Sequence, residues 1–255
     1  EELRLVRPGL SGRLASWLER FSGRFSLRFA KAVLGVTQEI ADYECRVHRV
    51  RKPASVYPNG IDPRDLPVLG DGRDPAAVQA AFICGEFSPW HGLDKLLDAA
   101  AQCADRRLDG SLTIHLIGRL HHDQQKAVAA CRHPDIRFIV HGHLPDAQYR
   151  TILEACDFGI ASLAMERQGL TQASTLKVRE MLALGLPVYS GHRDLALPSE
   201  QPFVLVAEAV DLPTMMAFGR RTKTISRQAV RSQSLPLIDK RAAMAQVVAF
   251  LRALP

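Results

Sequence analysis

Residues 174–188 read STLKVREMLALGLPV and predict a short helix that runs directly into a buried strand. The helical pattern covers 175–184 and ends at Gly185, and Pro187 opens an apolar run over 187–190. A helix and an apolar strand joined by so short a turn are typical of a sheet whose parallel strands alternate with helices.

This predicted helix carries Lys177 and Glu180 on neighbouring points of one face. One interpretation is an intrahelical ion pair, worth about 0.3–0.5 kcal/mol, although glutamate ordinarily precedes lysine in such pairs. The other interpretation is that both side chains bind one ligand. An ammonium and a helix N-terminus suit a diphosphate, and a carboxylate suits the two hydroxyls of a ribose. Both groups occur side by side in a sugar nucleotide.

The same alternation extends through the rest of the chain from residue 80. Such a pattern predicts an α/β fold, a parallel sheet with helices on both faces, whose ligands bind where the carboxyl ends of the strands meet. The predicted strands are 80–84, 112–117, 136–140, 158–162, 187–190 and 203–206, and the predicted helices are 93–104, 122–132, 146–156, 175–184 and 239–254.

The first 57 residues have a different character. Residues 10–31 alternate large apolar residues with arginines at helical spacing, which predicts a basic amphipathic helix with a break near Gly23. Packing on a neighbouring domain is the leading interpretation of this helix, and contact with an anionic membrane or a lipid-linked acceptor is the alternative. A strand at 32–37 and a helix at 38–48 follow, and Pro58-Asn59-Gly60 marks a turn.

Composition narrows the class of protein. The chain has 255 residues, a net charge of +6 and five scattered cysteines, which we interpret as reduced thiols of a cytoplasmic protein. A basic surface favours anionic partners. No apolar run is long enough to span a bilayer, and the first residues lack the pattern of a secretory signal. The scattered basic charge and the lack of a recognition motif argue against nucleic acid.

Several loops after predicted strands could hold a ligand. Gly85 and Gly92 flank a turn into a helix, where the backbone can approach a phosphate, and the guanidinium of Arg119 could pair with one. The turn at 142–145 could contact a base. The histidines at 121, 122, 141 and 143 lack the spacing of metal ligands, and we expect neither a metal nor a cofactor.

Five motifs follow one another between residues 32 and 210: VYPNGID, CGEFSPWHGLDKLLDAA, LTIHLIGRL, VHGHLPDAQYRTILEACDFGIA and ASTLKVREMLALGLPV. This succession resembles the C-terminal, donor-binding half of retaining glycosyltransferases with the GT-B fold. The resemblance implies a Rossmann-like donor domain over 58–238, a remnant of the N-terminal acceptor domain over 1–57 and a closing helix over 239–255. The chain would then be a truncated form or one half of a split enzyme.

The resemblance also assigns roles to individual residues. It implies that Glu180 holds the ribose and that the turn with His143 and Leu144 holds the base. The donor diphosphate would contact Gly85, His91, Arg119 and Lys177, and the donor sugar would meet the loop with Glu166, Gly169, Leu170 and Thr171. The catalytic residues stay unassigned.

Three positions depart from the family pattern. Glu86 and His91 stand where many relatives carry Arg and Lys, and Gln172 stands in place of a Glu. The function implied is transfer of a sugar from a nucleotide diphosphate sugar to an acceptor sugar or lipid-linked glycan, with retention, in polysaccharide or glycoconjugate synthesis. Two alternatives remain, a non-catalytic sugar-nucleotide-binding subunit and a GT-B-like epimerase.

Overall fold

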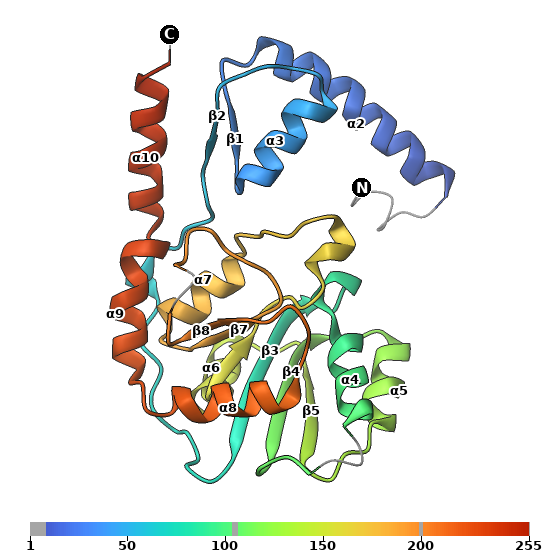
Figure 1. Cartoon of the computed structure of the whole chain (residues 1–255), viewed down its shortest axis with the longest axis vertical. Helices are drawn as coiled ribbons and strands as arrows, with labels where there is room; N and C mark the ends of the chain where they lie inside the picture. The colour runs from blue at the N-terminus through green and yellow to red at the C-terminus, as the bar shows by residue number, and fades with distance from the viewer. Residues whose placement is uncertain (1–8, 104–106, 199–200, 255) are drawn as a thin grey trace.

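The computed structural model describes residues 9–103, 107–198 and 201–254, and it contains two separate parallel sheets (Figure 1). The larger sheet forms the body of the molecule, and the smaller one belongs to the N-terminal segment. The boundary between residues 57 and 58 falls between the two sheets.

The larger sheet has six strands in the order β5-β4-β3-β6-β7-β8, and every pairing is parallel. The chain proceeds from β3 outward to β5 and then returns to the other side of β3, so the strand order reverses between β3 and β6. This confirms the predicted fold class. The strands are β3 (Val78–Glu86), β4 (Leu112–Arg119), β5 (Ile136–Gly142), β6 (Phe158–Ile160), β7 (Val188–Ser190) and β8 (Val204–Val206).

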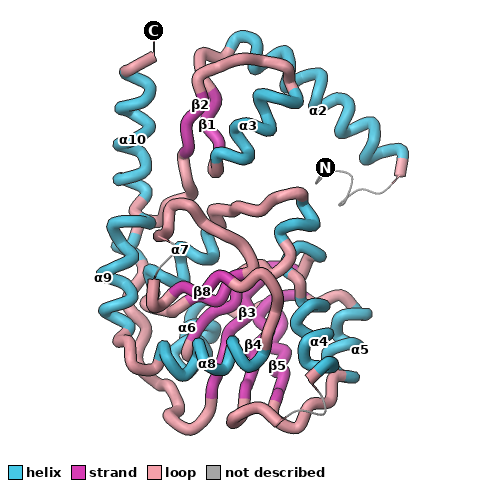
Figure 2. The backbone as a smooth tube through the Cα atoms, in the orientation of Figure 1, coloured by secondary structure: helices cyan, strands magenta, loops and turns pink. Residues whose placement is uncertain are grey.

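Helices cover both faces of this sheet (Figure 2). Side chains of β3 alternate between two apolar cores: Phe82 points into one and Ala81 into the other. The first core is closed by α4 (Leu93–Gln102), α5 (His122–Ala130) and α8 (Leu212–Thr222), and the second by α6 (Asp146–Ala155), α7 (Leu176–Ala183) and α9 (Arg227–Ile238).

Two of these helices, α8 and α9, were not expected from the sequence. Their apolar positions are interrupted by several basic and polar residues, and Pro236 lies inside α9. Asp211 and Ser226 nevertheless cap them, each accepting a hydrogen bond from a first-turn N–H. The last helix is α10 (Lys240–Arg252), close to its predicted limits.

The N-terminal segment consists of α2 (Leu10–Phe29), β1 (Val33–Gly35), α3 (Gln38–Val47) and β2 (Ala54–Val56), with β1 and β2 paired in parallel. The expected break of the first helix near Gly23 is wrong, because α2 is continuous. Gly23 instead permits close packing, since a Cβ there would lie 2.4 Å from the His48 ring. None of the described helices is both long and apolar enough to cross a membrane.

The linker between the two sheets is fastened to the start of α7. The N–H of Asn59 donates to Ser174 Oγ over 2.9 Å, and its side-chain amide donates to the Ser174 carbonyl. Thr175 occupies the N-cap position of α7 without a side-chain hydrogen bond. Ser174 Oγ, one residue earlier, bonds to Asn59 and to Arg179.

Arg179 also holds the linker to α7, from a buried position. Its side chain is fully buried, and its Nε donates to the Asn59 carbonyl over 2.8 Å. Its two terminal nitrogens pair with both oxygens of Asp194, in the loop after β7. One guanidinium therefore joins the linker, α7 and that loop.

We expect Asp194→Ala to lower the free energy of unfolding by about 3–5 kcal/mol, because it leaves a buried guanidinium without its counter-charge. Asp94→Ala is the matched control. Asp94 also pairs with an arginine, Arg167, but both side chains are partly exposed, so about 0–1 kcal/mol should be lost. Urea unfolding followed by circular dichroism measures both. Equal losses would show that burial of the Arg179 pair is unimportant.

Candidate functional site

Helix α7 directs Lys177 and Glu180 to different partners at the carboxyl ends of the strands. Lys177 Nζ lies 3.1 Å from Sγ of Cys84, near the end of β3. Glu180 accepts a hydrogen bond from the hydroxyl of Tyr149 on α6. No ion pair among the described residues joins Lys177 to Glu180, so the intrahelical ion pair does not form. Both side chains are half-buried.

Cys84 is a poor counter-ion for this lysine. It is 3 % exposed, and burial raises the pKa of its thiol. A neutral thiol leaves the ammonium of Lys177 without a compensating negative charge at that end of the strand. The lysine is therefore available to an anion from solution.

His91 lies beside Lys177 and is a neutral imidazole at physiological pH. Burial, assisted by the charge of Lys177, lowers its pKa to about 4. Its Nδ1 accepts the N–H of Ser88 over 2.9 Å. The proton of the neutral ring must then sit on Nε2, which makes that atom a hydrogen-bond donor.

Glycines keep the backbone open beside these groups. A Cβ on Gly85 would meet no atom within 4 Å, so the space next to this strand end is free. Gly92 has φ +74°, and a Cβ there would lie 2.9 Å from Leu163. Leu163 belongs to the loop after β6, so the two loops at the point of strand reversal are in direct contact.

Arg119 lies at the rim of this region and is engaged by Glu86. The guanidinium and the carboxylate form an ion pair, and Nε2 of His121 lies 3.0 Å from the other carboxylate oxygen. The hydrogen bond from Arg119 also lowers the pKa of Glu86. Glu86, one of the three positions that depart from the family pattern, thus holds Arg119 in place.

Glu166, in the loop after β6, is fixed by a lysine of α4. Its carboxylate lies 2.6 Å from Nζ of Lys95, which also donates to the Leu163 carbonyl. Gly169 ends the short 3-10 turn Met165–Gln168 with φ +72°. Leu170, which is half-buried, and Thr171, which is exposed, follow it.

The far part of this loop is held by the N-terminal segment. One carboxylate oxygen of Glu39, on α3, accepts the backbone N–H groups of Thr171 and Gln172, each over 3.1 Å. A carboxylate that accepts two adjacent N–H groups shows that this stretch of backbone suits an anionic oxygen.

The turn with His143 and Leu144 follows β5 and is largely exposed. Gly142 begins it with φ +69°. The neighbouring His141 turns away from it and stacks on His115 of β4, with Nδ1 and Nε2 2.9 Å apart. The described residues contain no group of three His, Cys, Asp or Glu side chains placed to share a metal ion.

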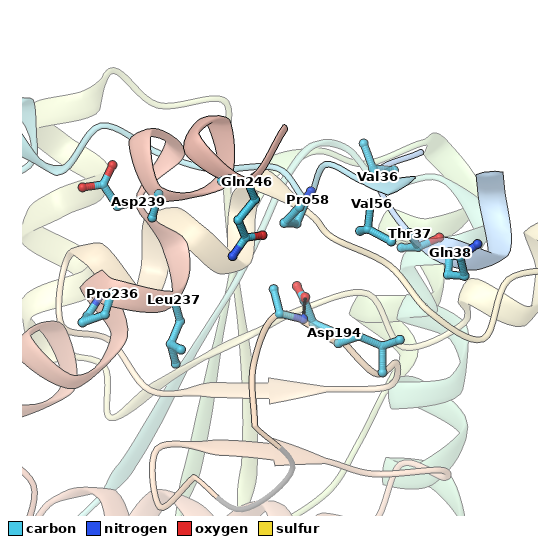
Figure 3. A pocket seen from close by; sticks show the side chains of 14 residues that line it. Val36, Thr37, Gln38, Val56, Pro58, Asp194, Pro236, Leu237, Asp239 and Gln246 are labelled. Carbon is cyan, nitrogen blue, oxygen red and sulfur yellow. Dashed lines mark hydrogen bonds between the residues drawn. The ribbon is translucent and has the colours of Figure 1, made fainter. Parts of the chain in front are cut away.

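The described residues also line cavities at two other places, and neither of these cavities is lined by Lys177 or Glu180. One, of about 410 Å³, lies between α3, the linker and α10, and residues such as Thr37, Asp194 and Gln246 line it (Figure 3). The other, of about 580 Å³, is an open groove between α5 and the edge strand β5. Of the predicted donor residues, His91 and Lys177 lie close together near the end of β3.

Sequence reasoning did not identify four residues of this region: Glu39, Cys84, Lys95 and Tyr149. Each acts on a partner at least 31 positions away in the chain. Their spacing therefore contained no signal. Cys84 is the exception, because its position at the end of the predicted strand 80–84 could have indicated that it lies near the site.

No protein-family model and no curated protein sequence matches the chain. Solved structures do match. The lipopolysaccharide outer core galactosyltransferase WaaB in its apo form aligns with a TM-score of 0.61 and 14% identity, over 89% of this chain and 63% of that one. Sucrose-phosphate synthase from Thermosynechococcus elongatus aligns with a TM-score of 0.63 and 16% identity, over 93% and 61%. TarM aligns with a TM-score of 0.61 and 10% identity, over 91% and 45%.

The chain has the fold of the C-terminal half of GT-B glycosyltransferases. It spans less than two thirds of the length of these neighbours. The GT-B fold confirms the resemblance stated from the sequence. It also places the loops around Gly85, Leu163 and Lys177 at the point of strand reversal, where open parallel sheets bind their ligands.

We expect the free energy of unfolding to fall as the pH is lowered from 6.5 towards 4. Burial lowers the pKa of His91 and of His115 from 6.5 to about 4, so the unfolded chain binds more protons in this window. His115 faces His141, Gln79 and Arg137, and two of these partners oppose a further positive charge. Urea midpoints against pH should flatten in His115→Gln. The exposed-site control His122→Gln should retain the parent slope, and an unchanged slope in His115→Gln would contradict the assignment.

We also expect Glu39→Ala to release the backbone of residues 171 and 172. These two N–H groups lose their common acceptor, so their hydrogen exchange should accelerate about tenfold, while exchange within α7 stays constant. Gln38→Ala, next to it on α3, is the control, because Gln38 bonds only within its own helix. Equal exchange in both variants would show that Glu39 does not hold the loop.

Proposed function

We propose that this chain is the donor-binding half of a retaining glycosyltransferase that acts on a nucleotide diphosphate sugar. The acceptor would be a hydroxyl of a sugar or of a lipid-linked glycan, in cytoplasmic synthesis of a polysaccharide or glycoconjugate. Retention is inferred from the resemblance to retaining enzymes. Neither a cofactor nor nucleic acid enters this proposal.

One observation carries the proposal. A single helix presents an ammonium towards the end of β3 and a carboxylate towards α6, beside the point of strand reversal, where a ligand would lie between them. A sugar nucleotide has a matching order of groups, with its diphosphate next to its ribose. Lys177 would hold the first and Glu180 the second.

The diphosphate end would be neutralised by several donors. As the bond from the anomeric carbon to the diphosphate oxygen breaks, the leaving diphosphate gains negative charge, and stabilising that charge lowers the barrier. In this proposal Lys177, Nε2–H of His91 and the first N–H groups of α7 would donate to the diphosphate beside Gly85, where a Cβ would meet no atom within 4 Å. Arg119 would reach the diphosphate from the rim if Glu86 releases it.

The nucleoside end would extend towards α6. Tyr149 donates to one oxygen of Glu180 and leaves the other available to a ribose hydroxyl. The base would then lie against the turn with His143 and Leu144. The sugar would meet the loop of Glu166, Gly169, Leu170 and Thr171.

A thermal-shift screen with a panel of sugar nucleotides identifies the donor, because a ligand that binds only the folded state raises its melting temperature. With that donor, calorimetry should show about tenfold to hundredfold weaker binding for Lys177→Ala and for Glu180→Ala, since each loses a charge-assisted hydrogen bond. Removing the sugar from the ligand should leave the Glu180 effect intact.

Lys126→Ala is the matched control, because Lys126 is exposed on α5 and should leave binding unchanged. Donor binding would be refuted if no sugar nucleotide of the panel raised the melting temperature. A donor that binds the Lys177→Ala and Glu180→Ala variants as tightly as the parent would refute the residue assignment. Transfer to an acceptor, measured by release of nucleoside diphosphate, separates an enzyme from a binding subunit.

A further inference from the structure

We propose that α2 lies flat on an anionic phospholipid surface, with its aromatic face inserted at the level of the headgroups. This helix is at the periphery of the molecule, on the outer side of the N-terminal segment (Figure 1). The proposal concerns a surface that donor binding does not use. It stands or falls independently of sugar transfer.

The side of α2 that faces the protein carries small residues. Gly12 and Ser16 are the residues of this helix that are fully buried. Gly23 lies against the ring of His48, where a Cβ would be only 2.4 Å away. These three positions fall on one side at helical spacing. The helix is therefore docked through contacts that only small side chains allow.

The large apolar side chains consequently point outward. Trp17 is 61 % exposed and Phe21 is 68 % exposed, and their rings stack on each other. A soluble surface usually shows apolar residues singly, whereas a continuous stripe marks an interaction site. The stripe, here called the aromatic face, consists of Leu10, Leu14, Trp17, Leu18, Phe21, Phe25 and Phe29, all exposed.

Positive charge flanks the aromatic face along its length. Arg13, Arg20, Arg24 and Arg28 are all exposed and fall at its edge at helical spacing, and none forms an ion pair with another described residue. Glu19, the one acidic residue of α2, lies on the opposite side of the helix. An uncompensated row of arginines beside apolar side chains is complementary to anionic headgroups above acyl chains.

The mode of contact follows from the composition of the helix. α2 is not apolar enough to cross a bilayer. Twenty residues lying flat give about 30 Å of aromatic and basic surface. Tryptophan and phenylalanine are suited to the boundary between headgroups and acyl chains, and arginine can extend its charge into the headgroups. A protein partner would meet the aromatic face but would not need this row of arginines.

The test is a titration of the 255-residue chain with two kinds of vesicle: pure phosphatidylcholine, and equal parts of phosphatidylglycerol and phosphatidylcholine. Trp17 fluorescence should shift to the blue with the anionic vesicles, and the protein should co-sediment with them. Added salt should weaken binding, since part of it is electrostatic. Trp17→Phe should co-sediment but lose the spectral shift, which assigns the signal to α2.

Two double variants of α2, together with a control double variant elsewhere, separate the contributions of charge and of aromatic side chains. Arg20→Gln with Arg24→Gln should lower the partition coefficient for anionic vesicles about tenfold or more, because each arginine near such a surface contributes measurably. Lys126→Gln with Arg137→Gln removes the same charge from exposed positions of the larger sheet's unit and should have little effect. Phe21→Ser with Phe25→Ser should abolish the blue shift, and circular dichroism verifies that both variants fold.

Three outcomes would overturn the proposal. The first is no binding to anionic vesicles. The second is equal weakening by the α2 and the control charge variants, which would indicate general attraction of a basic protein. The third is concentration-dependent self-association that buries Trp17 without vesicles and is lost in Phe21→Ser with Phe25→Ser. That result would make the aromatic face an interface between copies of this chain.

Discussion

The arrangement of this molecule depends on one buried guanidinium. Arg179 donates at once to the linker at Asn59, to Ser174 before α7 and to Asp194 after β7. A buried charge that loses its partner is strongly destabilising, so these three segments cannot shift independently without a large cost. The same helix presents Lys177 and Glu180 on its other sides. Their positions therefore depend on the hydrogen bonds of Arg179.

Much of the fold could be predicted from periodicity alone. Strands such as 112–117 and 136–140 are mostly apolar, and helices such as 93–104 have regular apolar spacing, so the local sequence pattern agrees with the overall fold. Helices α8 and α9 were missed, because their buried residues are separated by arginines and a proline. The break predicted near Gly23 is wrong, since in sequence a glycine required for packing looks the same as one that breaks a helix.

The candidate site was predictable only in outline. The resemblance assigned Gly85, His91 and Lys177 to one ligand, and the folded chain brings His91 and Cys84, the neighbour of Gly85, beside Lys177. The partners that tune these residues could not be predicted in this way. Tyr149 reaches Glu180 from another helix, and Glu39 reaches Thr171 from the other sheet, so the relevant distances exist only in the folded chain.

The attachment of Asn59 to Ser174 has a mechanical consequence. A linker between two sheets is ordinarily a place where one body can swing freely relative to the other. Here the first residues past the small sheet are fastened to the helix that bears Lys177 and Glu180. Any rotation of the N-terminal segment must therefore displace the residues that lead into α7, so such a motion would also change the positions of Lys177 and Glu180.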